Sequence, residues 1–238
     1  MPSTNDQQKP TALITGASRG LGLALARGLA ARGWQLIIDA RGEAALEEAR
    51  LELASRTQVT AIPGDIRNED HRLALGKAAR EAGGLDLVVN NAGILGPSPQ
   101  PALLDYPLET LAKVFVANVV AQLGVLQAVR ETLKPGTAVI NVTSDAAVEP
   151  YEGWGGYGAS KAALEQLSAV LAVENPGWRV YWVDPGDIRT QMHQEAFPGE
   201  DITDRPLPEN SVPGFIALIE NRPPSGRYTA RELLPEEA

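Results

Sequence analysis

The feature that most constrains the fold is a regular alternation of short apolar runs with longer segments of helical pattern. The first apolar run, Thr11–Thr15, is followed by the Ala- and Leu-rich segment Leu21–Ala31. The alternation continues with apolar runs at 35–39, 59–63, 85–90, 137–143 and 179–183 and helical patterns at 43–56, 69–82, 107–133 and 160–173. Strands that are apolar throughout are typical of a parallel sheet with helices on both faces. The pattern therefore predicts a doubly wound α/β fold.

The length of 238 residues suits one domain, which we expect to span 11–238 after a short disordered arm at 1–10. The regular pattern weakens after Pro185, and residues 187–213 are rich in Asp, Glu, Pro and Arg. We expect this segment to be loop-rich and to act as a mobile lid over bound substrate. A short helix at 214–221 and a last strand at 226–230 are predicted for the tail.

Composition argues against several classes of function. The chain has no cysteine, which excludes disulfides, thiolate metal sites and cysteine nucleophiles, and with only two histidines no metal site is expected. The formal net charge of −9 repels phosphate backbones and anionic membranes, so neither nucleic acid nor a membrane is an expected partner. The polar start lacks a signal core, and no run approaches the ~18 apolar residues of a membrane span. A cytoplasmic location is therefore predicted.

A glycine cluster follows the first strand and precedes the first helix, in the segment Thr15–Gly22 (TGASRGLG). Glycine permits a tight turn and lets backbone N–H groups approach a pyrophosphate closely. The start of the helix adds free N–H donors and a partial positive charge. A glycine cluster alone is often a plain turn, but the order strand, glycines, helix favours a phosphate cradle.

Three further motifs follow in order: Asn90-Asn91-Ala92-Gly93 after a strand, Tyr157-Gly158-Ala159-Ser160-Lys161 near a helix start, and Pro185-Gly186 after a later strand. With the T-G-x-x-x-G-x-G spacing of the glycine cluster, this set resembles the short single-domain branch of the short-chain dehydrogenase/reductase family, over residues 11–190. The resemblance implies a Rossmann-type sheet in the order 3-2-1-4-5-6-7. It also implies a nicotinamide cofactor, a small-molecule carbonyl or alcohol substrate, and a homodimer or homotetramer.

The predicted catalytic group centres on Tyr157 and Lys161, which lie one helical turn apart on one face. A tyrosine pKa is normally ~10, and a neighbouring ammonium lowers it. Taken alone the pair could be an ordinary surface pair, but Ser144 follows a strand at the expected crevice and can donate to a substrate oxygen. Thr143 competes for that role, and the spacing to Tyr157 favours Ser144.

Asn118 lies among apolar residues of the long helical pattern at 107–133. By resemblance, it sits at a local helix irregularity and holds a water that feeds a proton relay to Lys161. The alternative is a packed asparagine with its amide satisfied by hydrogen bonds. The predicted catalytic residues are thus Asn118, Ser144, Tyr157 and Lys161.

Cofactor residues are carried over from the resemblance. Asp65 would bond the adenine amino group, although an N-cap or turn role is also open to it. Asn91-Ala92-Gly93 would line the adenosine side, and Thr190 would bond the nicotinamide carboxamide. The predicted cofactor-binding residues are Gly16, Ser18, Arg19, Gly20, Leu21, Gly22, Arg41, Asp65, Ile66, Asn91, Ala92, Gly93, Tyr157, Lys161, Pro185, Gly186, Ile188 and Thr190.

Cofactor choice depends on the end of the second strand, Ile38-Asp39-Ala40-Arg41. Distance from the glycine turn points to Asp39 as a reader of the ribose 2′-OH, and hence to NAD(H). Aligned on the family pattern, the discriminating acid falls instead at Ala40, and Asp39 would face away. Arg41 and Arg19 could then bind a 2′-phosphate, which favours NADP(H) over NAD(H).

Around the expected substrate position, Tyr151 and Trp154 could form an apolar wall or simply pack their loop onto the core. Arg189, Met192, His193 and Phe197 lie on the predicted lid, and the sequence does not rank them. The predicted function is hydride transfer between NADP(H) or NAD(H) and a carbonyl/alcohol pair, with Tyr157 as general acid/base. The alternative is a regulatory or scaffold protein that binds the nucleotide without turnover.

Overall fold

The computed structural model describes residues 9–233, and within them seven parallel strands form one sheet. The strand order β3-β2-β1-β4-β5-β6-β7 confirms the predicted doubly wound fold. The strands are β1 (Thr11–Ile14), β2 (Gln35–Ala40), β3 (Val59–Pro63), β4 (Leu85–Asn90), β5 (Leu133–Val142), β6 (Arg179–Asp184) and β7 (Gly226–Thr229). The predicted arm lies outside the described residues apart from Lys9 and Pro10.

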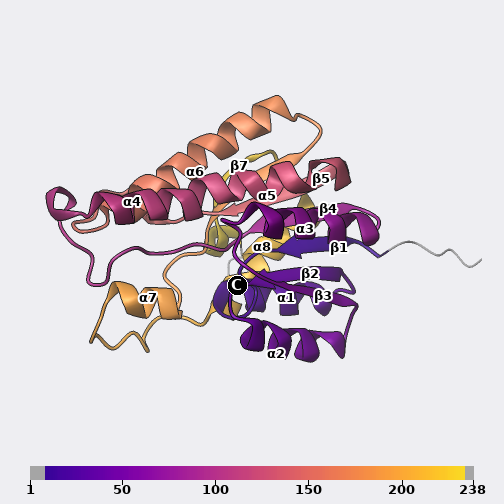
Figure 1. Ribbon diagram of the computed structural model, residues 1–238, viewed down its shortest axis with the longest axis horizontal. Coiled ribbons are helices and arrows are strands. Elements are labelled where there is room, and N and C mark those ends of the chain that lie inside the picture. Colours follow the sequence, from indigo (N-terminus) through magenta and orange to yellow (C-terminus); the bar gives the residue numbers. More distant parts are fainter. Residues whose placement is uncertain (1–8, 234–238) are drawn as a thin grey trace, which may run out of the picture.

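Helices cover both faces of the sheet. On one face lie α1 (Gly20–Ala30), α2 (Glu43–Ala54) and α8 (Val212–Asn221), and on the other lie α3 (Glu69–Glu81), α5 (Ala121–Val129) and α6 (Gly155–Glu174). Figure 1 shows α5 and α6 above the sheet and α1 and α2 below it, with α4 (Leu108–Phe115) continuing the line of α5. Each face of the sheet has its own hydrophobic core. Because successive strand residues point to opposite faces, Ala12 and Ile14 pack with α1, α2 and α8, whereas Leu13 packs with α3 and α5.

Helix α6 begins at Gly155, earlier than the predicted start at Ser160. Two glycines at a helix start have low helix propensity, which hides this turn from the sequence pattern. Tertiary packing overrides the propensity, because the ring of Tyr106 lies where a Cβ on Gly156 would be. Tyr157 is therefore in the first turn of α6, directly under the carboxyl ends of the strands.

The predicted lid at 187–213 contains regular structure that its weak periodicity did not indicate. It includes α7 (Gln191–Ala196) and a single 3-10 turn at Pro208–Asn210. The side chain of Thr190 caps α7 by accepting from the N–H of His193 at 3.1 Å. Figure 1 shows α7 apart from both helical layers.

The stretch Leu108–Thr132 is helical throughout and, within the described residues, has the length and mean hydropathy of a membrane-crossing helix, although polar residues interrupt its apolar run as the sequence indicated. Its most apolar window has a mean hydropathy of 1.6, enough by length and composition alone to cross a bilayer. Half of that window is buried inside the fold, which is the pattern of a core helix. Within the stretch, Val116–Val120 form a π-helical turn that separates α4 from α5.

Candidate active site

A cavity of about 1010 Å³ runs along the carboxyl ends of the strands. Parallel α/β sheets bind ligands at this edge because the loops there leave a crevice between them. The cavity brings together residues far apart in the chain, from the loop between β1 and α1 to the segment before α7. Every predicted site residue lines it except Gly22 and Asn118, which lie directly behind the lining.

The glycine loop at 16–22 is held tightly against the end of β4. Gly16 has a φ of +68°, in the left-handed region that favours glycine. A Cβ on Gly22 would overlap the carbonyl oxygen of Gly16 and the side chain of Asn91. That side chain donates to the carbonyl oxygens of Thr15 at 2.9 Å and Gly16 at 3.1 Å, which fixes the path of the loop backbone.

At the adenosine end, Asp39 and Arg41 occupy different environments. The Asp39 side chain is only 1% exposed, and one carboxylate oxygen accepts from the N–H of Gly16 at 2.8 Å. Arg41 is exposed at the cavity wall. Asp65, the residue expected to face adenine, forms an ion pair with Arg67 at 2.6 Å. Its carboxylate also accepts from the backbone N–H of Arg67, so Asp65 acts as a turn residue, as the alternative interpretation expected.

Tyr157 lies at the opposite end of the cavity, beside Ser144. Burial raises the pKa of the Tyr157 phenol well above its usual range, and the carboxylates of Asp184 and Asp145 act in the same direction. The hydrogen bond with Ser144 opposes this increase. The lowered pKa predicted from the Tyr157/Lys161 spacing is therefore not found for the chain alone, because desolvation of the buried phenolate raises the pKa.

Lys161 is buried beneath Tyr157. Its Nζ lies 5.5 Å from the centre of the Tyr157 ring and donates to the carbonyl oxygen of Val142 at 2.8 Å. Burial lowers the pKa of Lys161 to about 8. The lysine is consequently able to change protonation close to neutral pH, which is unusual for this side chain.

Asn118 lies in the π-helical turn, at the irregularity that the resemblance implies. Its amide forms two hydrogen bonds of 2.9 Å with the backbone of Ile94 and donates to Ser160 Oγ at 3.0 Å. The side chain is thus packed and satisfied, as the alternative interpretation expected. Its participation in a proton relay stays a prediction.

Two positioning contacts around Ser144 were not foreseen from the sequence. Asp145 accepts from the Ser144 hydroxyl at 2.9 Å and from the Tyr151 hydroxyl at 2.9 Å, which orients the serine side chain. Arg227 of β7 donates to the carbonyl oxygen of Ser144 at 3.2 Å and to Glu165 of α6 at 3.0 Å.

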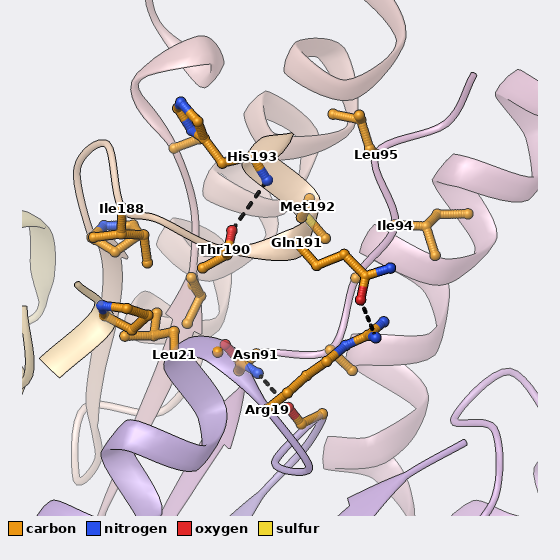
Figure 2. Close-up of a pocket in the computed structure, with 18 of the residues that line it drawn as sticks. Arg19, Leu21, Asn91, Ile94, Leu95, Ile188, Thr190, Gln191, Met192 and His193 are labelled. Carbon is orange, nitrogen blue, oxygen red and sulfur yellow. Dashed lines mark hydrogen bonds between the residues drawn. The ribbon is translucent and has the colours of Figure 1, made fainter. Parts of the chain in front are cut away.

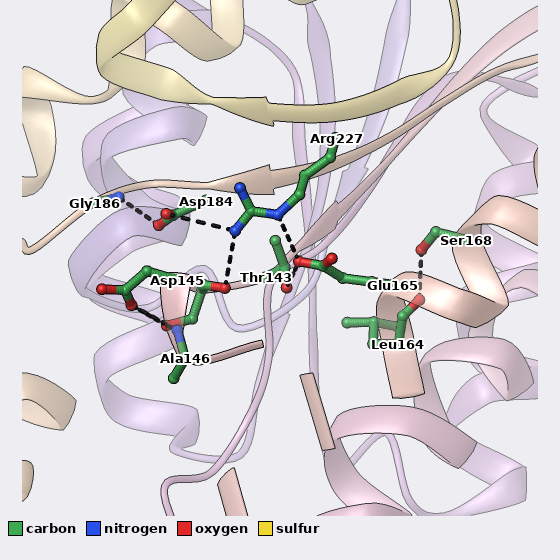
Figure 3. Close-up of polar contacts among 10 residues, drawn as sticks. Thr143, Asp145, Ala146, Leu164, Glu165, Ser168, Asp184, Gly186 and Arg227 are labelled. Carbon is green, nitrogen blue, oxygen red and sulfur yellow. Dashed lines mark hydrogen bonds and ion pairs between the residues drawn. The ribbon is translucent and has the colours of Figure 1, made fainter. Parts of the chain in front are cut away.

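Arg227 also reaches the end of β6, where it lies 3.9 Å from Asp184 (Figure 3). Glu165 in turn accepts from the Thr143 hydroxyl at 2.8 Å, so the Thr143 side chain is part of the hydrogen-bond network around Arg227. One guanidinium thereby connects the ends of β5 and β6 with the helix that carries Tyr157 and Lys161. Asp145 could have been suspected from its position after Ser144, but no local pattern indicates Arg227.

A family model described as short chain dehydrogenase matches residues 10–201. The chain belongs to the short-chain dehydrogenase family. Sepiapterin reductase of Rattus norvegicus is 35% identical over 199 residues, which cover 77% of this chain and 76% of the relative. Serine 3-dehydrogenase of Agrobacterium fabrum is 33% identical over 239 residues, covering 94% and 93%.

Solved structures of short-chain dehydrogenases share the fold over nearly the whole length. The structure of one from Shigella flexneri, complexed with NADP, has a TM-score of 0.87 and 28% sequence identity, and covers 93% of this chain and 97% of that chain. The predicted family and fold are therefore confirmed, and the chain is an oxidoreductase of this family.

In this short-chain dehydrogenase, the substrate end of the cavity has aromatic and apolar walls. Trp154 lies edge-on to Tyr157 with ring centres 5.8 Å apart, and its other side meets Phe197 of the lid at 5.9 Å. Met192 and His193 line the cavity from α7. Trp154 therefore both packs its loop and joins α6 to the predicted lid segment.

The segment 187–213 also contacts the glycine loop. Arg19 donates to the side chain of Gln191, and Figure 2 shows the two side chains directed toward one another across the cavity. The methyl group of Thr190 lies against Gly20, since a Cβ there would be 3.6 Å from it. These contacts place the start of α7 against the glycine loop.

We predict that backbone amides in residues 187–213 exchange more slowly with solvent when cofactor and a substrate analogue are bound together. The physical reason is that ligands in the cavity would add contacts to α7 beyond those with Arg19 and Trp154. Hydrogen exchange followed by mass spectrometry measures the change, with peptides of β1 and β4 as internal references. Equal exchange with and without both ligands would contradict a lid role.

Proposed function

We propose that this short-chain dehydrogenase transfers a hydride between NADP(H) and a carbonyl/alcohol pair, with Tyr157 as general acid/base. The observation that carries the proposal is the convergence of Ser144, Tyr157 and Lys161 at the end of a cavity whose other end is a glycine-rich phosphate cradle. The chain's relatives include proteins named as reductases and dehydrogenases, which supports the same reaction class.

The residues present fit a nicotinamide dinucleotide. Side chains are excluded at Gly16 and Gly22, which lets a pyrophosphate approach the backbone N–H groups at the start of α1. The N–H groups of Gly16 and Ala17 bond Asp39 instead. Arg19, Arg41 and Arg67 line the same end of the cavity and supply positive charge. The volume of about 1010 Å³ is at the upper end of the range for ligand pockets.

NADP(H) is the cofactor that the adenosine end favours. Both carboxylate oxygens of Asp39 are engaged inside the protein, one by Gly16 and the other by His71 at 2.8 Å. Asp39 is therefore poorly placed to accept from a ribose 2′-OH. Arg41 is exposed at the cavity wall and is suited to a 2′-phosphate as a charge-assisted donor.

The nicotinamide, when bound, supplies or accepts the hydride. Tyr157 keeps its proton at neutral pH because burial raises the pKa of its phenol, so it can donate to the oxygen of a carbonyl that is being reduced. The Ser144 hydroxyl lies beside it and can donate to the same oxygen once it releases Asp145. Lys161, with a pKa of about 8, can change protonation near neutral pH and lies next to the Tyr157 ring, with its Nζ 5.5 Å from the ring centre.

The walls of Trp154, Met192 and Leu95 favour a substrate with an apolar or planar body next to the reacting carbonyl. The test is NADPH oxidation, followed by absorbance, with a panel of ketones, aldehydes and quinones. We expect turnover of at least one member, with apolar carbonyl compounds ahead of small polar ones. Tight NADPH binding without turnover of any member would favour the alternative, a nucleotide-binding protein without catalysis.

We also propose that the chain forms a homodimer or homotetramer through exposed apolar side chains of α4, the π-helical turn Val116–Val120 and α6. Leu108 is 78% exposed, Val120 60% and Val173 82%, which is a large apolar surface for a monomer. Light scattering at micromolar concentration should give at least twice the 25.3 kDa of one chain. Val120→Asp should reduce the mass, whereas Leu73→Asp on the exposed side of α3 should not. A monomeric wild type would contradict the proposal.

A further inference from the structure

Beneath the glycine loop lies a buried Asp–His pair that the proposed reaction does not use. His71 is in the first turn of α3, and its Nε2 lies 2.8 Å from one carboxylate oxygen of Asp39. The other oxygen accepts from the N–H of Gly16 at 2.8 Å. The side chains are 6% and 1% exposed, so water does not screen the contact. A chain of three groups thus joins α3 to the phosphate cradle.

The local backbone is adapted to this imidazole. Gly64, at the end of β3, faces the ring, and a Cβ there would overlap His71 Nδ1. The backbone of Asp39 contributes as well, because its carbonyl oxygen accepts from the N–H of Ala17 at 2.8 Å. Asp39 therefore holds two successive residues of the glycine loop, one through its side chain and one through its main chain.

The elements next to the pair carry other charged groups. The loop before α3 contributes Asp65, whose ion pair with Arg67 is 2.6 Å long, and α3 contributes Arg72, which donates to the carbonyl oxygen of Ile66. The end of β2 contributes Arg41, and the glycine loop contributes Arg19. Burial raises the pKa of the Asp39 carboxyl group, and hydrogen bonds from His71 and Gly16 oppose this rise. Of the groups named here, Asp65 adds a smaller increase to the pKa of Asp39.

We propose that the Asp39–His71 pair is a proton-dependent positioning element for the cofactor, which holds the glycine loop through Gly16 and weakens NADPH binding when His71 loses its proton. This inference rests on the nicotinamide cofactor of the proposed function. With His71 protonated, the pair has no net charge. With His71 neutral, one buried negative charge lies next to the site of the cofactor phosphates, and less water is present to screen it.

The sign of the pH effect follows from this charge. Raising the pH removes the His71 proton and adds a repulsion for the cofactor phosphates. NADPH is affected more than NADH because its additional phosphate binds at the β2 end, next to Asp39. A single linked proton changes a dissociation constant by no more than about tenfold per pH unit. The phosphate of NADPH itself titrates near pH ~6, but this contribution is common to every protein variant.

The experiment measures dissociation constants of NADPH and NADH by calorimetry between pH 6 and 8.5. His71→Gln keeps a donor toward Asp39 but removes the titrating group. We expect this variant to bind NADPH roughly threefold to tenfold more weakly than wild type at the acid end and equally at the alkaline end. Asp39→Asn keeps an acceptor for Gly16 and removes the charge, and should bind NADPH more tightly than wild type at the alkaline end.

Glu81→Gln is the matched control, because it changes an exposed charge on the same helix, α3, and should follow the wild-type profile. Identical pH profiles for wild type and His71→Gln would overturn the inference while leaving the proposed function intact. If the wild type bound neither nucleotide, both the inference and the proposed function would fail.

A second measurement follows the His71 ring of the folded wild-type protein by NMR. The chain has only two histidines, so the ring resonance of His71 is assigned in the NMR spectrum by its absence from His71→Gln. Saturating NADPH should move the midpoint of its titration upward by roughly one pH unit, and NADH by less. An unmoved midpoint with NADPH bound would contradict the proton linkage.

Discussion

Tyr157→Phe is expected to lower turnover by at least about a hundredfold, the low end of what general acid–base groups contribute. The substitution removes the only proton that the Tyr157 ring can donate and keeps its packing against Trp154, whose ring centre is 5.8 Å away. Cofactor binding should stay nearly intact, because the phosphate cradle is at the other end of the cavity. Steady-state rates and a separate NADPH titration measure the two effects.

Tyr151→Phe is the matched control for this prediction. It removes a hydroxyl from the same aromatic group, one that bonds Asp145 at 2.9 Å and lies nearer the surface. We expect a much smaller loss of turnover, since its role is to orient Asp145. Equal losses in both variants would mean that the aromatic packing, and not the Tyr157 proton, determines the rate.

Arg41→Ala is expected to weaken NADPH binding by roughly tenfold to a hundredfold, the range for a charge-assisted hydrogen bond to phosphate. NADH binding should change little because NADH lacks the 2′-phosphate. The apparent Michaelis constants for the two cofactors, measured with one carbonyl substrate, give the ratio. Arg56→Ala, an exposed arginine beyond the end of α2, is the control and should leave both constants unchanged.

The opposite result would assign the ribose to a different residue. If the wild type preferred NADH and Asp39→Ala abolished that preference, Asp39 would be the reader of the 2′-OH despite its burial. The 1% exposure of the Asp39 side chain and its two hydrogen bonds argue for the first outcome.

The parts of the site that could be predicted from the sequence are those whose residues are close in the chain. The glycine loop is one uninterrupted segment, and Tyr157 and Lys161 are one helical turn apart, so their spacing alone indicates a shared face. Strand ends are equally local, because an apolar run that stops at Ser144 marks the edge of the sheet. The sheet order came from the resemblance and agrees with the structure.

The parts that could not be predicted depend on contacts between distant segments. Arg227 and Glu165 are 62 positions apart, and His71 and Asp39 are 32 apart, so no window of the sequence relates them. The raised pKa of Tyr157 has the same origin, because its main cause is burial, which depends on the whole fold. The early start of α6 is due to packing by Tyr106, against the preference of its glycines.

The most direct test of the central claim is transfer of label from NADPH that carries deuterium at both C4 positions. A carbonyl compound turned over in the panel is reduced with this cofactor, and the product alcohol is analysed by mass spectrometry and NMR. Direct hydride transfer predicts one deuterium on the carbinol carbon of each product molecule, at a rate that falls sharply in Tyr157→Phe. A product alcohol without deuterium, or a rate unaffected by Tyr157→Phe, would contradict the account.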